Sequence, residues 1–117
     1  MRIVTLLITL AMVMTAGLAF AQSEEGTANF YSDKFEGKKT ASGEVYDKTK
    51  LTAAHKKLAY GTKVKVTNVE NGKSVVVTVN DRMGASNPAV IDVTPKAAEE
   101  LGFLKAGKAK VKLEVQK

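Results

Sequence analysis

Three segments of the sequence predict a mostly β domain. Residues 62–67 (TKVKVT) alternate polar and apolar side chains, as a half-buried strand does. Residues 74–79 (SVVVTV) are β-branched and apolar, which is typical of a more fully buried strand, and residues 110–115 (KVKLEV) alternate again. The chain has no cysteine and therefore no disulfide. A closed barrel is one architecture that stabilises such a chain, because closure leaves no open strand edge.

The first 21 residues have the features of an export signal. Arg2 supplies a positive charge, residues 3–18 are almost wholly apolar, and Ala19-Phe20-Ala21 forms an A-x-A cleavage site. A transmembrane anchor is the competing interpretation, but the apolar run is short and no basic stop-transfer cluster follows it. We therefore expect cleavage between Ala21 and Gln22. The expected product is a soluble periplasmic or secreted protein without a stable membrane anchor.

The segments after the signal predict one domain with a long loop near its start. Residues 22–27 are polar and acidic and predict a flexible tail, and residues 28–117 form the domain. Residues 28–31 predict a short strand. Residues 32–46 are rich in Gly, Ser and Lys and predict an ordered loop of a length that is usually functional. Residues 49–55 predict a helical turn.

The second half of the chain contains a hairpin signal and one further strand. Asn71-Gly72 is the preferred pair for a two-residue type I′ turn between strands, although a longer loop is also compatible with it. Residues 83–88 predict a loop, and residues 89–93 predict a strand.

One short helix is expected between the last two strands. Thr94 is a suitable N-cap, Pro95 suits the first helical position, and Gly102 suits the end. Ala97, Ala98 and Leu101 supply its apolar side.

The chain is basic, with 18 Lys and Arg against 12 Asp and Glu and a formal net charge of +6. Anionic cell wall is one partner for such a protein, and lysines that only maintain solubility are an equally good explanation. Nucleic-acid binding is not expected, because aromatics are few and no arginine cluster occurs. A single histidine and no cysteine give no usual transition-metal site, so no metal or other cofactor is expected.

Two motifs lead to a family. Residues 40–47 (TASGEVYD) and 51–56 (LTAAHK) precede a strand pair that ends in residues 79–82 (VNDR). This pattern resembles the rare lipoprotein A family of septal lytic transglycosylases, and the resemblance covers roughly residues 28–115. It implies a mostly β fold, a six-stranded double-psi β-barrel with one or two short helices.

The chain departs from the family pattern at several positions. Phe30 stands where tryptophan is usual, Ser32 replaces a glycine, and Met83-Gly84-Ala85 replaces G-P-F. The acylated cysteine and the C-terminal sugar-binding repeat domain of many relatives are missing from this sequence. We therefore expect the catalytic barrel alone, with an altered loop at the border of its groove.

The resemblance implies three catalytic residues. Asp81 is the expected catalytic acid, although an Asn-Asp turn that only caps a strand end is the simpler alternative. His55 is expected to orient the acid, polarise a sugar hydroxyl or accept a proton; the alternative is a structural hydrogen-bonding histidine. Glu44 is expected to raise the pKa of Asp81 or to bind sugar hydroxyls; the alternative is a solvated loop glutamate.

Four further residues are expected to bind substrate. Tyr31 and Tyr46 could stack on sugar rings or pack in the core. Arg82 could bind a muramyl lactyl or peptide carboxylate, or pair with Asp81 or Asp92. Asp92 lies in an Ile-Asp-Val context similar to the F-D-L of the related expansins, whose aspartate serves polysaccharide binding or wall loosening. It could equally hold the barrel together through backbone N–H groups.

The implied function is that of an endolytic peptidoglycan lytic transglycosylase, acting in wall remodelling or daughter-cell separation. Such an enzyme cleaves the bond between N-acetylmuramic acid (MurNAc) and N-acetylglucosamine (GlcNAc) and leaves 1,6-anhydro-MurNAc ends. The expected partner is the peptidoglycan glycan strand, bound by a monomer. Two alternatives are an expansin-like, non-catalytic glycan-binding or wall-loosening barrel, and a small inhibitor or interaction protein of the envelope.

Overall fold

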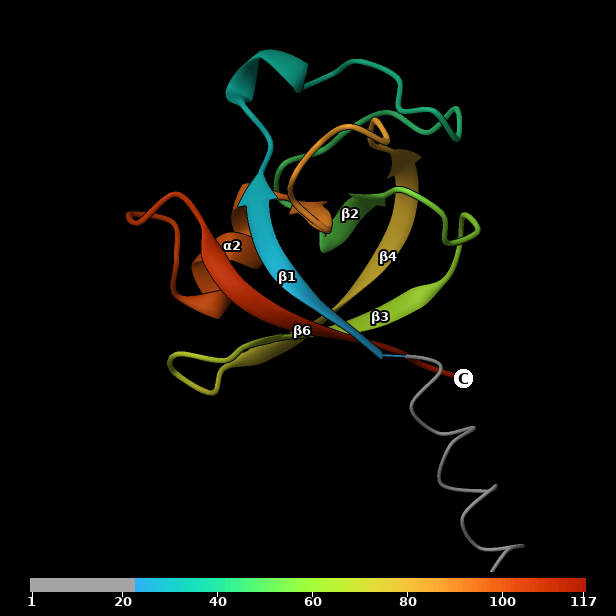
Figure 1. The fold of residues 1–117 in the computed structure, drawn as a ribbon. Helices are drawn as coiled ribbons and strands as arrows, with labels where there is room; N and C mark the ends of the chain where they lie inside the picture. Colours follow the sequence, from blue (N-terminus) through green and yellow to red (C-terminus); the bar gives the residue numbers. More distant parts are fainter. Residues whose placement is uncertain (1–22) are drawn as a thin grey trace, which may run out of the picture.

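The computed structural model describes residues 23–117, which form a closed six-stranded barrel (Figure 1). Two short helical segments accompany the barrel, so the predicted six strands with one or two short helices are confirmed. The predicted signal sequence, residues 1–21, lies outside the described residues. The elements are β1 (Ser23–Phe30), the 3₁₀ turn η1 (Asp33–Phe35), β2 (Thr52–His55), β3 (Lys63–Asn68), β4 (Ser74–Arg82), β5 (Ile91–Val93), α2 (Pro95–Leu101) and β6 (Ala109–Val115).

The strands follow one another round the barrel in the order β1-β5-β2-β4-β3-β6. Strands β1 and β5 are parallel, as are β2 and β4, and the other neighbours are antiparallel. Parallel neighbours need a crossover connection rather than a tight turn. The segment between β1 and β2, residues 31–51, lies over the barrel end at which β1 and β4 finish (Figure 1). Two predicted site residues, Glu44 and Tyr46, are in this loop.

The barrel interior is filled by apolar side chains from every strand and from α2. Strict alternation on β3 and β4 sends one set of valines inward, as the sequence pattern predicts. The helix adds its apolar side, and Phe103 after it is also buried. The core comprises Ala28, Ala53, Val64, Val66, Val77, Val79, Ile91, Val93, Ala97, Ala98, Leu101, Phe103, Ala109, Val111 and Leu113.

The prediction of a flexible tail over residues 22–27 is wrong for residues 23–27. These residues are the first part of β1 and pair with β6, from Ser23 opposite Glu114 to Thr27 opposite Lys110. The polar composition is compatible with a strand because this end of β1 is exposed to solvent. Backbone pairing with β6, rather than burial of side chains, therefore holds the segment in place and closes the barrel.

Three local predictions need correction. The expected helical turn at residues 49–55 does not form: residues 52–55 are strand β2, because their backbone pairs with β4 and β5 on both sides. The turn at Asn71-Gly72 is not type I′: only Gly72 has a positive φ, and five residues separate β3 from β4. The strand predicted for residues 89–93 is shorter, Ile91–Val93.

The helix prediction is confirmed at both ends. The Oγ1 atom of Thr94 accepts a hydrogen bond from the backbone N–H of Ala97, Pro95 occupies the first turn, and Gly102 ends the helix in the left-handed conformation with φ of 80°. The same hydroxyl donates to the carbonyl of Lys50, and so ties the helix start to the loop before β2. No helix within residues 23–117 is long and apolar enough to cross a membrane.

Replacement of Thr94 by alanine is expected to destabilise the domain. The change removes both the N-cap acceptor and the donor to the Lys50 carbonyl. The free energy of unfolding should therefore fall by about 1–2 kcal/mol. For a domain of this size the midpoint of thermal unfolding should fall by roughly 5–10 °C. Thr94→Ser retains the hydroxyl and should lose much less; equal losses in the two variants would contradict the role of the hydroxyl.

Candidate active site

A β-bulge determines where Asp81 points. On β4, Val77 and Val79 face the core, so strict alternation would turn the side chain of Asp81 inward as well. The register against β2 shifts instead: Ala53 pairs with Val79, but Ala54 pairs with Asp81. Asn80 is the extra residue of the bulge, and such an insertion re-aims the side chains that follow it. Asp81 therefore shares a face with Ala54, outside the core.

The carboxylate of Asp81 accepts three hydrogen bonds. The hydroxyl of Tyr31 donates to Oδ2 at 2.6 Å. The backbone N–H groups of Ala41 and Arg82 both donate to Oδ1 at 2.8 Å. Two of the three donors are backbone N–H groups, whose positions the fold fixes. The three donors together fix the orientation of Asp81 relative to the end of β1 and to the long loop.

Asp92 lies on the opposite side of the same alanine. Strand β2 runs between β4 and β5, and Ala54 pairs with Asp81 on one strand and with Asp92 on the other. Burial raises the pKa of the Asp92 carboxyl above its usual value, and the negative charge of Asp81 raises it further. Within residues 23–117 no donor forms a hydrogen bond or ion pair with this carboxyl group. The two aspartates therefore share one face but differ in their hydrogen-bond partners.

Both aspartates line one shallow cavity of about 260 Å³. Ala54 lies between them and is buried, packed with Met83 and Tyr31 at the edge of the cavity. The other side chains at the cavity are mostly aromatic or apolar: Phe30, Tyr31, Phe35 and Met83, with Ser32 and Arg82. Of the seven predicted site residues, the structure thus brings Asp81, Asp92, Tyr31 and Arg82 together here.

Two tyrosines form a stack beside this cavity. The rings of Tyr31 and Tyr46 lie with their centroids 4.4 Å apart, and Phe35 meets Tyr31 edge-on. Burial and the hydrogen bond to Asp81 raise the pKa of Tyr31 far above its usual range, so its hydroxyl remains a donor. Tyr46 is only 2% exposed, and burial raises its pKa to about 12. Tyr46 therefore supports Tyr31 from behind and offers no face to a sugar ring.

Glu44 lies next to this cavity but contacts a different residue of β4. Its Oε1 accepts a hydrogen bond from Nδ2 of Asn80 at 3.1 Å. Glu44 and Asn80 line two adjoining cavities of about 470 and 310 Å³. The buried Oδ1 of Asn80 has no partner among the described residues. The loop that donates Ala41 N–H to Asp81 thus also brings the Glu44 carboxylate to the neighbouring residue of the same strand.

His55 faces the other side of β2. Consecutive register pairs, Ala54 with Asp81 and His55 with Arg82, send the two β2 side chains to opposite faces. The ring is 5% exposed, and its Nδ1 accepts hydrogen bonds from the N–H groups of Lys57 and Leu58. The neutral ring therefore carries its proton on Nε2, which lies 3.0 Å from Oε1 of Glu24.

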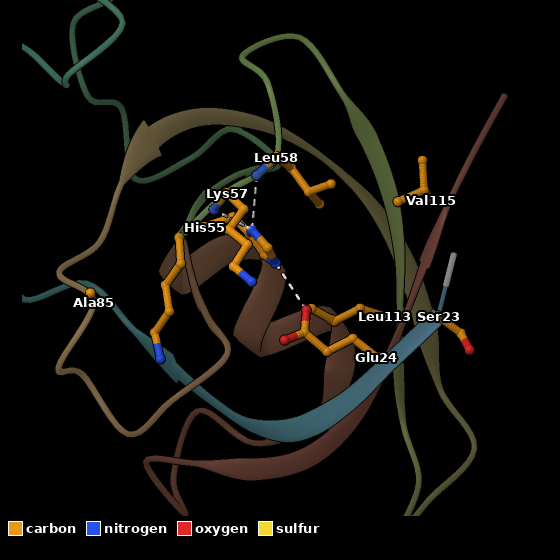
Figure 2. A pocket seen from close by; sticks show the side chains of 9 residues that line it. Ser23, Glu24, His55, Lys57, Leu58, Ala85, Leu113 and Val115 are labelled. Carbon is orange, nitrogen blue, oxygen red and sulfur yellow. Dashed lines mark hydrogen bonds and ion pairs between the residues drawn. The ribbon is translucent and has the colours of Figure 1, made fainter. Parts of the chain in front are cut away.

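A larger cavity of about 660 Å³ surrounds this histidine. Figure 2 shows His55 and Glu24 pointing toward each other across it, with Leu113 and Val115 of β6 at its wall. The structure therefore does not place the imidazole of His55 with Asp81. The sequence analysis missed Glu24 as a partner of His55, because the polar composition of residues 22–27 predicted a flexible tail. Only the pairing of this segment with β6 shows that Glu24 is held near His55.

Arg82 links the two faces. Its Nη1 donates to the backbone carbonyls of His55 at 3.0 Å and Leu58 at 2.8 Å, and its guanidinium lies 4.6 Å from the ring centre of Tyr60. In residues 23–117 it forms no ion pair with Asp81 or Asp92. Arg82 thus fixes the segment after β2, while its own N–H holds Asp81.

Comparisons with known proteins agree with this architecture. A family model described as "Lytic transglycolase" matches residues 23–113. A protein of *Neisseria meningitidis* serogroup A, named endolytic peptidoglycan transglycosylase RlpA, is 48% identical over 92 residues; the match covers 79% of this chain and 38% of that protein. The chain therefore spans well under half of that relative's length.

Solved structures agree on the fold. The *Streptomyces* papain inhibitor superposes with a TM-score of 0.67 at 21% identity, covering 82% of this chain and 96% of that one. The apo *Clavibacter michiganensis* expansin superposes with a TM-score of 0.63 at 21% identity, covering 82% and 51%. At such low identity these two likenesses support the double-psi β-barrel only.

The family model covers most of the chain, including all six strands of the closed barrel up to Leu113. From Ser23 to Leu113 the chain belongs to the lytic transglycolase family, with a double-psi β-barrel of the rare lipoprotein A type.

Proposed function

We propose that this protein is an endolytic peptidoglycan lytic transglycosylase that cleaves the MurNAc–GlcNAc bond and leaves 1,6-anhydro-MurNAc ends. The observation that supports this most directly is the pair of aspartates on either side of Ala54, in one cavity beside an exposed loop. A pair of carboxyl groups in one cavity can supply the acid and the base that glycosidic bond cleavage uses. Membership of the family and the name of the Neisseria relative support the same reaction.

The proposed reaction uses an internal nucleophile. The glycosidic oxygen is protonated, an oxocarbenium-like state forms at C1 of MurNAc, and the C6 hydroxyl of the same sugar attacks C1. Because nucleophile and electrophile belong to one ring, proximity supplies much of the rate and no water is consumed. Asp81 is the central carboxylate of this proposal, since its three donors hold it in one orientation at the cavity.

The other predicted site residues receive proposed roles that their positions support. Glu44 would accept hydrogen bonds from sugar hydroxyl or acetamido groups in the cavities that it lines, and Asn80 would hold its carboxylate there. Tyr31 would both orient Asp81 and contact sugar. His55 and Arg82 would act as positioning residues, because Arg82 joins the backbone of His55 to that of Asp81.

The proposed setting is the bacterial envelope. The apolar segment of residues 3–18 and the A-x-A site predict export, and the peptidoglycan strand is the proposed partner of a periplasmic or secreted monomer. Removal of Arg2 with the signal would lower the formal net charge from +6 to +5, which still suits a surface that approaches an anionic wall.

Replacement of Asp81 by asparagine is expected to abolish glycan cleavage while the fold survives. Purified sacculi, intact and peptide-stripped, would be digested with wild type and variant, and soluble products read by mass spectrometry. Wild type should release anhydro-MurNAc ends, and Asp81→Asn should release at least about 100-fold fewer. Glu99→Gln, the same type of change on an exposed helix position, is the matched control and should retain activity.

The same digestion separates the alternatives. Reducing ends instead of anhydro ends would identify a hydrolase and contradict the transglycosylase proposal. Binding to both kinds of sacculi without any release would instead support a non-catalytic, expansin-like glycan binder.

The environment of Asp92 predicts a pH-dependent effect on stability. Its pKa is raised in the folded state, so ionisation costs more there than in the unfolded chain. Stability is therefore lost as the pH rises from the unfolded pKa through the folded pKa. Asp92→Asn should raise the melting temperature by a few degrees at pH 7 and change it little at pH 3. A variant that melts lower than wild type at pH 7 would contradict this reading, and Glu99→Gln should show no such pattern.

A further inference from the structure

The two aspartates of the cavity differ in the number of hydrogen-bond donors to their carboxyl groups. Asp81 accepts three hydrogen bonds, all from groups that remain donors at neutral pH: the Tyr31 hydroxyl and two backbone N–H groups. Asp92 is half-buried and receives no hydrogen bond from residues 23–117. Three donors thus hold the carboxylate of Asp81 in place, whereas burial and the charge of Asp81 raise the pKa of the Asp92 carboxyl.

We propose that Asp92 is the proton donor to the glycosidic oxygen and that Asp81 remains the ionised partner that receives the proton of the C6 hydroxyl. This assignment rests on the proposed transglycosylase function. It differs from the expectation for Asp81 drawn from the sequence, in which that residue is the acid.

The proposed step conserves protons, bonds and electron pairs. The proton of the Asp92 carboxyl moves to the glycosidic oxygen, and the bond between that oxygen and C1 of MurNAc breaks with its electron pair on the departing GlcNAc oxygen. The C6 oxygen forms a new bond to C1, and its proton passes to Asp81. Asp92 is then ionised and Asp81 protonated, and exchange of one proton through solvent restores the starting state. No water is added to the glycan.

The strand arrangement suits a division of labour between two residues. Asp81 and Asp92 lie on the two strands that flank β2, so their Cα atoms are roughly 10 Å apart, two strand spacings. Both carboxyl groups line the same cavity. A sugar ring bound in that cavity can present its C6 hydroxyl to one carboxyl group and its glycosidic oxygen to the other.

The groups that face Asp92 are few. From β4 come Asp81 and Arg82, and the guanidinium of Arg82 is turned toward backbone carbonyls and Tyr60. From the end of β1 comes Tyr31, whose hydroxyl stays protonated through the neutral range. On β1, the residue in register with Asp92 is the uncharged Asn29. In the described part of the chain the charge that faces Asp92 at neutral pH is therefore chiefly that of Asp81.

A substrate with an activated leaving group separates the two roles. The probe is a GlcNAc–MurNAc oligosaccharide that carries 2,4-dinitrophenol on C1 of its terminal MurNAc. Dinitrophenolate departs as a stable anion and needs no proton, whereas the C6 hydroxyl must still be deprotonated. Asp92→Asn should lose at least about 100-fold on sacculi but stay within about tenfold of wild type on the probe. Asp81→Asn should lose at least about 100-fold on both.

Other outcomes overturn the assignment. Asp92 would be excluded as the donor if Asp92→Asn cleaves sacculi normally. It would also be excluded if the variant loses as much activity on the probe as on sacculi. Near wild-type activity of Asp81→Asn on the probe would show instead that Asp81 is the proton donor. Failure of the proposed function itself is seen separately, as an absence of anhydro ends from wild type.

The pH profile gives a second readout if wild type turns the probe over poorly. For sacculi, kcat/KM of the wild type should fall at high pH as the donor ionises. The residual activity of Asp92→Asn should lack this alkaline fall, whereas the residual activity of Asp81→Asn should retain it. An alkaline fall that persists in Asp92→Asn would contradict the assignment.

Discussion

The β-bulge between β2 and β4 is the constraint on which the candidate site depends. Without the extra residue Asn80, the alternation that buries Val77 and Val79 would turn Asp81 into the core, where an unpaired carboxylate is very costly. The bulge moves Asp81 to the outer face, and leaves Asn80 to hold Glu44 on the other side of the strand. Because of this one bulge, Asn80 contacts Glu44 while the adjacent Asp81 lines the cavity.

The hydrogen bonds to Asp81 connect the site to distant parts of the chain. The donors come from the end of β1, from the long loop at Ala41 and from β4 itself. A substrate that contacts Tyr31 or the loop is therefore coupled to the orientation of the carboxylate. Asp92, on the far side of Ala54, lacks such donors and is partly buried. The two carboxyl groups of one cavity therefore differ in the hydrogen-bond donors that hold them.

A second layer supports this face from behind. His55 points away from the aspartates and binds Glu24, yet its backbone carbonyl accepts from Arg82, the residue whose N–H holds Asp81. The geometry makes His55 a structural partner of the site rather than a neighbour of the reacting bond. Its cavity at the barrel end is a separate surface (Figure 2).

Local sequence determined the elements whose signals are short-range. Alternation fixed the inward faces of β3 and β4, and the cap residues Thr94 and Gly102 fixed the ends of α2, because these depend on neighbours a few residues away. Family motifs predicted the fold, and four of the seven residues that they suggested for the site line one cavity. Tertiary structure decided the rest. The strand character of residues 23–27 and of β2 comes from backbone pairing with distant strands, and the grouping of Asp81 with Asp92 instead of His55 comes from a register shift. Strand pairing and register involve residues far apart in the sequence, and a slip of one residue reverses the face of a side chain, so no local pattern encodes them.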